Sequence, residues 1–145
     1  MQSSVKISGF VKWKLIDRST NQILKEGGSA NTVTYAHIEN LAKMLETGSG
    51  TIDKVNLMKA GTTDTEFNIY STDLTTPIKE EIPTITRTGT TVKMSRVFVF
   101  DEDVTIEELG MFDTVSNRAI AFNHSISQLV AYVQALEVNW EIYYS

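Results

Sequence analysis

Alternating apolar and polar residues predict strands near both ends of the sequence. Between residues 5 and 15 apolar side chains recur at every second position, and lysine or serine fills most of the gaps. Residues 136–144 alternate in the same way and have the clearest strand pattern in the chain. A period of two places alternate side chains on opposite faces of a strand. We therefore expect two half-buried strands, with Trp13 and Trp140 in the core and Tyr143 facing outward.

One segment has helical spacing instead. Its apolar residues recur three and four positions apart, at Tyr35, Ile38, Leu41, Ala42 and Leu45. Asn31, Thr32 or Thr34 can cap the first turn, and Gly48 can end the last turn in the left-handed conformation. The pattern predicts a short α-helix at about residues 34–47. Its apolar stripe is expected to lie across a sheet, with His37 at the edge of the stripe.

Further apolar runs, separated by polar turns, predict more strands. Residues 22–25 would complete a hairpin with the first strand before Gly27 and Gly28 break the pattern. Residues 91–100 are apolar on both faces and would form a central strand. The other expected strands are residues 52–59, 84–88, 104–112 and 118–123. The fold class predicted for residues 1–145 is mainly β: a single antiparallel β-sandwich domain, jelly-roll-like, with one short helix.

The segment 61–83 predicts a long loop or arm. Thr, Asp, Ser and Gly dominate it up to residue 76, and the two prolines at its end favour an edge position in a sheet. Its large apolar residues could contact a neighbouring protein or could pin the loop to its own domain, and the pattern favours neither. The outward-facing Tyr143 could likewise anchor an interface or be an ordinary exposed aromatic. The candidate interface residues are Phe67, Ile69, Tyr70, Leu74 and Tyr143.

Composition limits the possible partners. The 145 residues contain no cysteine, which removes disulfides, thiol nucleophiles and cysteine-bound zinc. The net charge of -5 opposes a general attraction to nucleic acids. We find no basic stretch followed by an apolar run as in a secretory signal, and no apolar run long enough to cross a membrane. We expect a protein made in the cytoplasm, with no nucleic-acid or membrane partner.

No residue pattern predicts catalysis. The two histidines, His37 and His124, have neither metal-ligand spacing nor a G-x-S-x-G serine as a partner. The acidic residues 101–103 with Glu107 and Glu108 lack the spacing of a calcium loop, and Glu107 and Glu108 should point to opposite faces of a strand. A solvated turn is the interpretation that we favour for them. No enzyme activity, cofactor, metal or small-molecule substrate is expected.

Several short segments, in order along the chain, resemble patterns of small β-sandwich proteins of tailed-bacteriophage virions. The patterns are N-T-V-T, G-T-G, D-x-x-L…E, I-x-E-x-G-L-F and L-x-V-x-W-x-I. The chain departs from them at Thr63, where a second glycine is usual, and at Pro77 and Pro83. The matching segments are residues 31–34, 60–62, 73–74 with 79–81, 106–112 and 136–142.

The resemblance implies a non-enzymatic virion protein. A single compact domain suits a capsid decoration or cement subunit, which would bind a major capsid protein and form homo-oligomers, with trimers favoured by the local symmetry of a capsid. The alternative is a tail, baseplate or fibre-associated protein, with tail proteins as partners, that could include a receptor- or glycan-binding module. A glycan module should expose clustered aromatics, whereas most aromatics here have core positions. An enzyme of unfamiliar type is the remaining alternative.

Overall fold

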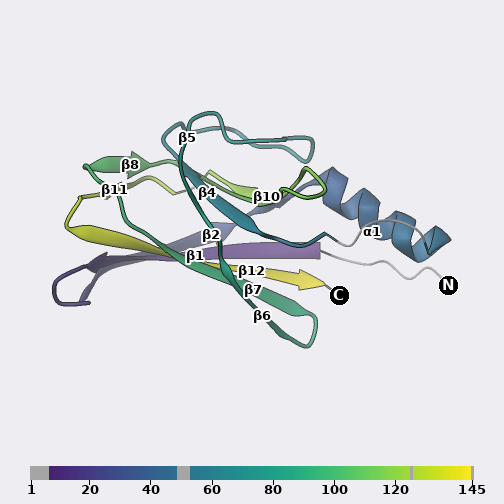
Figure 1. Ribbon diagram of the computed structural model, residues 1–145, viewed down its shortest axis with the longest axis horizontal. Helices are drawn as coiled ribbons and strands as arrows, with labels where there is room; N and C mark the ends of the chain where they lie inside the picture. The colour runs from purple at the N-terminus through teal and green to yellow at the C-terminus, as the bar shows by residue number, and fades with distance from the viewer. Residues whose placement is uncertain (1–6, 49–52, 125, 145) are drawn as a thin grey trace.

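The computed structural model describes residues 7–48, 53–124 and 126–144, except for the side chain of Leu45. Two five-stranded sheets pack face to face (Figure 1), in the orders β2-β1-β12-β7-β6 and β3-β10-β9-β4-β5, and β11 pairs with β8. The prediction of an antiparallel β-sandwich with one helix is confirmed. In chain order the elements are β1 (Ile7–Asp17), β2 (Ile23–Ala30), β3 (Thr32–Val33), α1 (Tyr35–Thr47), β4 (Leu57–Gly61), β5 (Pro77–Glu81), β6 (Thr84–Thr88), β7 (Thr91–Phe98), β8 (Val104–Ile106), β9 (Glu108–Asp113), β10 (Arg118–Asn123), β11 (Gln128–Val130) and β12 (Gln134–Tyr144).

The two clearest strand patterns pair with each other. β1 runs antiparallel to β12 along its whole length, from Ile7 opposite Tyr144 to Asp17 opposite Gln134. The alternation places Trp140 in the core at 0% exposure, and Trp13 is also buried, at 9%. β12 has β1 on one side and β7 on the other, so it is the middle strand of the first sheet. The C-terminal segment is therefore held in the centre of the sandwich.

Two strands of the second sheet, β9 and β10, are buried on both faces. Every residue of β9 is buried, as is every residue of β10 except Arg118. The prediction of a central strand at residues 91–100 is confirmed in its position, because β7 lies between β12 and β6. β7 ends at Phe98, however, and it buries Met94 and Phe98 but leaves Val97 43% exposed. β9 and β10 differ because the 62–76 loop covers their outer face, where Phe67 stacks on Phe122 with ring centroids 4.4 Å apart.

Gly27 and Gly28 continue β2 instead of ending it. A Cβ atom on Gly27 would lie 2.3 Å from the Trp13 ring, and one on Gly28 would lie 2.8 Å from the Phe10 ring. These glycines let the edge strand pass close over bulky side chains of β1. The expected break in the strand is therefore wrong, because glycine occurs not only in turns but also in strands whose backbone lies close to a large side chain.

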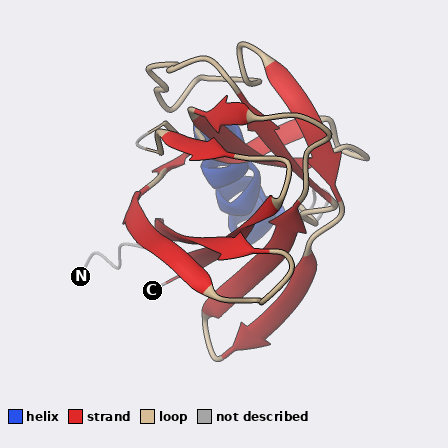
Figure 2. Cartoon of the chain, turned by 90° about the vertical axis from the view of Figure 1, so that its left-hand side faces the viewer, coloured by secondary structure: helices blue, strands red, loops and turns tan. Residues whose placement is uncertain are grey.

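The helix has the expected bounds but not the expected orientation. Thr34 caps α1 through its side chain, which accepts a hydrogen bond from the His37 N–H, and Gly48 ends α1 with φ of 66°. Figures 1 and 2 show α1 at one end of the sandwich rather than across a sheet. Its buried side chains are His37 and Asn40, whereas Tyr35 and Ile38 of the predicted apolar stripe are exposed. Helical spacing identifies the stripe but does not say which side the domain covers.

Other boundaries shift by a few residues. β4 begins at Leu57, later than expected, and the expected strand 104–112 is divided at Glu107 into β8 and β9. β5, with Pro77 at its start, is the edge of the second sheet as predicted. Residues 5 and 6 of the expected first strand and residue 52 of the expected strand 52–59 lie outside the described residues.

Candidate functional site: an exposed apolar surface

Four large apolar side chains lie exposed where α1 meets the 62–76 loop. We call Tyr35, Ile38, Ile69 and Tyr70 the α1–loop surface; their exposed fractions are 44%, 38%, 43% and 70%. The Tyr35 N–H donates to the Ile69 carbonyl at 2.6 Å, and the rings of Tyr35 and Tyr70 lie 5.5 Å apart. The helix start and the loop thus bring Tyr35, Ile69 and Tyr70 together, and Ile38 follows Tyr35 about one turn later on α1.

A shallow groove of about 200 Å³ runs beside this surface. Tyr35, Ile69 and Tyr70 form part of its wall, and Glu39 and Arg118 add charged groups. The surface therefore combines an apolar centre with polar neighbours, as interfaces between proteins do.

The structure separates the five predicted interface residues into three groups. Ile69 and Tyr70 belong to the α1–loop surface. Phe67 and Leu74, 8% and 5% exposed, lie in the cluster beneath the loop, so for these two the loop-pinning interpretation holds. Tyr143 is 38% exposed on β12. Its hydroxyl donates to the Glu141 carboxylate, which raises the pKa of Tyr143.

Glu108 fixes the loop that carries Ile69 and Tyr70. It is fully buried, and its Oε1 accepts hydrogen bonds from the Thr75 N–H at 2.8 Å and the Thr65 hydroxyl at 2.9 Å. Its Oε2 accepts from the N–H groups of Thr76 at 2.8 Å and Thr63 at 3.3 Å. The prediction of a solvated turn at Glu108 is therefore wrong, because the loop folds back over this carboxylate.

Gly61 leaves the space that Glu108 occupies. A Cβ atom at Gly61 would lie 2.3 Å from Glu108 Oε2 and 2.6 Å from the Thr76 carbonyl. Backbone N–H groups that converge on one carboxylate replace the water that the loop excludes. Sequence reasoning missed this site, although Glu108 shares a strand face with Gly110 and Phe112, which was a usable signal.

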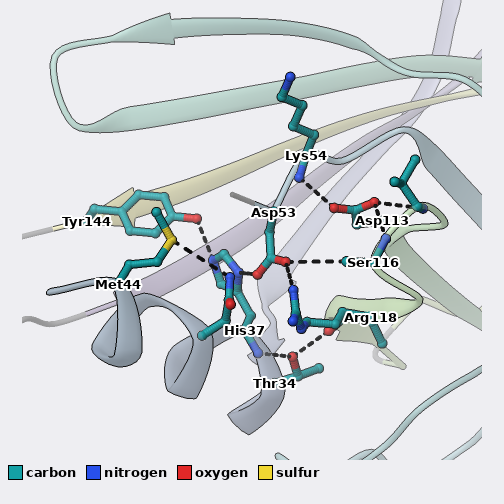
Figure 3. A network of polar contacts seen from close by, with 12 residues as sticks. Thr34, His37, Met44, Asp53, Lys54, Asp113, Ser116, Arg118 and Tyr144 are labelled. Carbon is teal, nitrogen blue, oxygen red and sulfur yellow. Dashed lines mark hydrogen bonds and ion pairs between the residues drawn. The ribbon is translucent and has the colours of Figure 1, made fainter. Parts of the chain in front are cut away.

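A buried polar network holds the other side of α1 (Figure 3). His37 Nδ1 lies 2.7 Å from Asp53 Oδ2, and His37 Nε2 lies 2.9 Å from the Tyr144 hydroxyl. Arg118 Nη1 donates to Asp53 Oδ1 at 2.7 Å. A carboxylate only accepts hydrogen bonds, so Nδ1 donates to Asp53, and in the neutral imidazole Nε2 then accepts from the Tyr144 hydroxyl. The network joins α1 to β10 and to the end of β12.

The order tyrosine, histidine, aspartate resembles a nucleophile with its base and orienting acid. Burial, with the charge of Asp53 adding to it, raises the pKa of Tyr144 to about 12. This phenol keeps its proton at neutral pH and is a poor nucleophile. His37, expected at a boundary, is only 4% exposed. These contacts hold α1 against β10 and the end of β12.

Asp113 extends this region by fixing the chain on either side of the network. Burial alone would raise the pKa of the Asp113 carboxyl, but the N–H groups of Lys54, Ser116 and Val115 donate to it and together hold its pKa below the ordinary value. The Lys54 N–H lies 2.9 Å from Oδ2. Asp113 therefore ties the 113–117 turn to the segment that carries Asp53.

A cavity of about 440 Å³ opens beside the network. Apolar residues of both sheets form most of its wall, including Ile85, Val92 and Ile120, while His37 and Tyr144 lie on its polar side. The size is within the range of small-molecule sites. The polar side chains of the network, however, already bond to one another.

Within the described residues no three His, Cys, Asp or Glu side chains gather as metal ligands, and His124 pairs with Asp64 alone at 3.6 Å. No helix in the described part of the chain is long and apolar enough to cross a membrane. No protein-family model, curated protein or solved structure matches the chain.

Proposed function

We propose that this protein is a non-enzymatic structural subunit that assembles with other proteins through the α1–loop surface. The observation that carries the proposal is the pair Tyr35 and Tyr70, two exposed aromatics held beside each other by a capped helix and a loop fixed on Glu108. Rigid aromatic side chains supply large contact area at small entropic cost. A surface of this kind suits a partner of complementary shape.

The polar network supports the same proposal because it is arranged for stability. Its Tyr144 hydroxyl is kept protonated and bonded to His37, and Asp53 is bonded to Arg118. A general base needs a pKa near the working pH, whereas the pKa of Tyr144 is raised to about 12. The residues of the network instead connect α1 to β10 and to the end of β12, and so fix the position of the helix.

The resemblance to phage virion proteins suggests where the assembly occurs. We propose a capsid decoration or cement subunit that binds the major capsid protein of a phage head, with the virion as its location. A sandwich with an outward-facing patch at one end can attach to a lattice by that end. Attachment to a tail or baseplate is the alternative.

Glycan binding is a second candidate, favoured by one observation. Two exposed tyrosines, Tyr35 and Tyr70, lie beside Glu39, Asn117 and Arg118 in the shallow groove, and sugars bind to aromatic faces next to polar groups. The two rings, however, are tilted by 52° to each other and form no flat platform. Protein contact therefore remains our first proposal.

Sedimentation of the purified protein with phage heads, with tails and with neither tests the proposal. We expect the wild type to sediment with heads, and Tyr70→Ser to lose that association. Tyr132→Ser is the matched control, because Tyr132 is 58% exposed in the turn between β11 and β12 and does not belong to the α1–loop surface. Binding to tails alone would move the protein to the tail, and binding to neither would contradict a virion role.

A further inference from the structure

We propose that the exposed stripe of α1 pairs with the same stripe of a second copy of this chain, antiparallel and about a two-fold axis. The inference rests on the proposed function and names a partner for part of the α1–loop surface. The two-fold dimer differs from the trimer that capsid symmetry favours, and it is argued from the exposed residues and the charges of α1.

The stripe has the spacing of a helix–helix seam. Tyr35, Ile38 and Ala42 lie three and four positions apart, and all three are exposed. At about 100° per residue they fall within roughly 60° of one another around the helix axis. Spacings of three and four are those with which one helix packs on another. The opposite side of α1 is already occupied, since His37 and Asn40 are buried.

The charges beside the stripe are self-complementary only in one orientation. Glu39 and Lys43 lie along the flank of α1, with Lys43 Nζ 3.4 Å from Glu39 Oε1. In an antiparallel pair centred near residue 41, Glu39 of each copy faces the partner's Lys43, and the two-fold axis repeats the contact. A parallel bundle would place like residues at the same level and would offer no such pairing.

The position of α1 makes this pairing accessible. The helix lies at one end of the sandwich, away from the strands that turn at the opposite end (Figure 1). Its thirteen residues span about 20 Å, and one face of a helix about 10 Å wide then offers only about 200 Å². A standard interface buries about 800 Å² on each partner. Tyr70, in ring contact with Tyr35, adds area at the rim. We therefore expect a weak, concentration-dependent dimer.

Charge reversal tests the pairing by sedimentation velocity over a range of protein concentrations. Glu39→Lys alone and Lys43→Glu alone should each weaken the dimer about tenfold, because both symmetric contacts become repulsive. The double variant should dimerise like the wild type. An equimolar mixture of the two single variants should also recover dimer, since the two positive charges on the helix of one variant then face the two negative charges on the helix of the other.

Recovery in the mixture cannot come from repair within a helix, because each single variant keeps its own like-charge pair. A wild type that is monomeric at all concentrations, a trimer, or a mixture that stays monomeric would each overturn the inference. Head association of a strictly monomeric wild type would leave the proposed function intact. A dimer that passes the mixing test but binds neither heads nor tails would uphold the pairing and reject the virion role.

Discussion

The ring of Tyr70 lies 5.5 Å from the ring of Tyr35, although Tyr70 belongs to a loop and Tyr35 to the first turn of α1. The contact exists because two other residues of the loop, Phe67 and Leu74, are buried against the second sheet. The loop thus uses two apolar residues for its own folding and leaves Ile69 and Tyr70 outside. The division explains why exposed apolar side chains occur on a loop whose backbone is well anchored.

Tyr70→Ser should separate association from stability. Tyr70 is 70% exposed, so its loss should change the free energy of unfolding by less than about 0.5 kcal/mol. Association with heads should fall, because the largest exposed ring of the α1–loop surface is removed. Urea denaturation and sedimentation measure the two effects. A large loss of stability would show that Tyr70 serves the fold and not an interface.

Glu108→Gln should loosen the 62–76 loop. The amide NH₂ that replaces one carboxylate oxygen is a donor and would face the N–H group of Thr75 or Thr76. We expect the free energy of unfolding to fall by about 2–3 kcal/mol. Glu107→Gln is the matched control, because Glu107 is half-buried and, among the contacts that the structure describes, its carboxylate accepts only from the Ser127 hydroxyl. Chemical denaturation of both variants checks this. Equal stability of the two would reject Glu108 as the anchor of the loop.

Trp140→Ala should lower the free energy of unfolding by about 3–5 kcal/mol, because the side chain is fully buried and its removal leaves a large cavity. Trp140→Phe should reduce the free energy of unfolding by less, since the indole Nε1 has no hydrogen-bond partner among the described residues. Melting temperatures of the two variants give the comparison. An unchanged melting temperature for Trp140→Ala would contradict the core position of this residue.

Tyr144 should make the protein sensitive to alkaline pH. Its pKa in the folded protein is raised to about 12 from the ordinary 10.0, so folding favours the protonated phenol. The associated stability is fully present below pH 10 and is lost as the pH rises through 12. Tyr144→Phe should remove this loss while costing about 1 kcal/mol at neutral pH, where His37 Nε2 loses its donor.

Urea denaturation of wild type and Tyr144→Phe between pH 8 and pH 12 measures that difference. The gap between the two proteins should narrow as the pH rises from 10 toward 12. A gap that stays constant over this range would show that Tyr144 is not held in its protonated form by folding.

Local patterns predict the strands and the helix because their causes are local. The period of two in β1 and β12 reflects one buried face, and Thr34 and Gly48 cap the helix through groups within a few residues. The buried positions of Trp13 and Trp140 follow from the same alternation. Edge placement of β5 follows from its proline.

The remaining features depend on contacts between distant parts of the chain. Glu108 is buried only because residues 63–76 return to cover it, and His37 meets Asp53 and Tyr144 only in the folded protein. The orientation of α1 follows from that network, which pulls the polar side of the helix inward. The apolar stripe of α1 therefore lies outside, beside the loop, whereas its spacing alone predicts that it packs on a sheet.

Hydroxyl-radical footprinting of the protein, free at low concentration and bound to phage heads, tests the central proposal most directly. Labelling of Tyr35 and Tyr70 should fall on binding, while labelling of Tyr132 should not change. Tyr132 is 58% exposed in the turn between β11 and β12. Figure 1 shows that this turn lies at the opposite end of the sandwich from α1. Protection of Tyr132 with unchanged labelling of Tyr35 and Tyr70 would contradict assembly through the α1–loop surface.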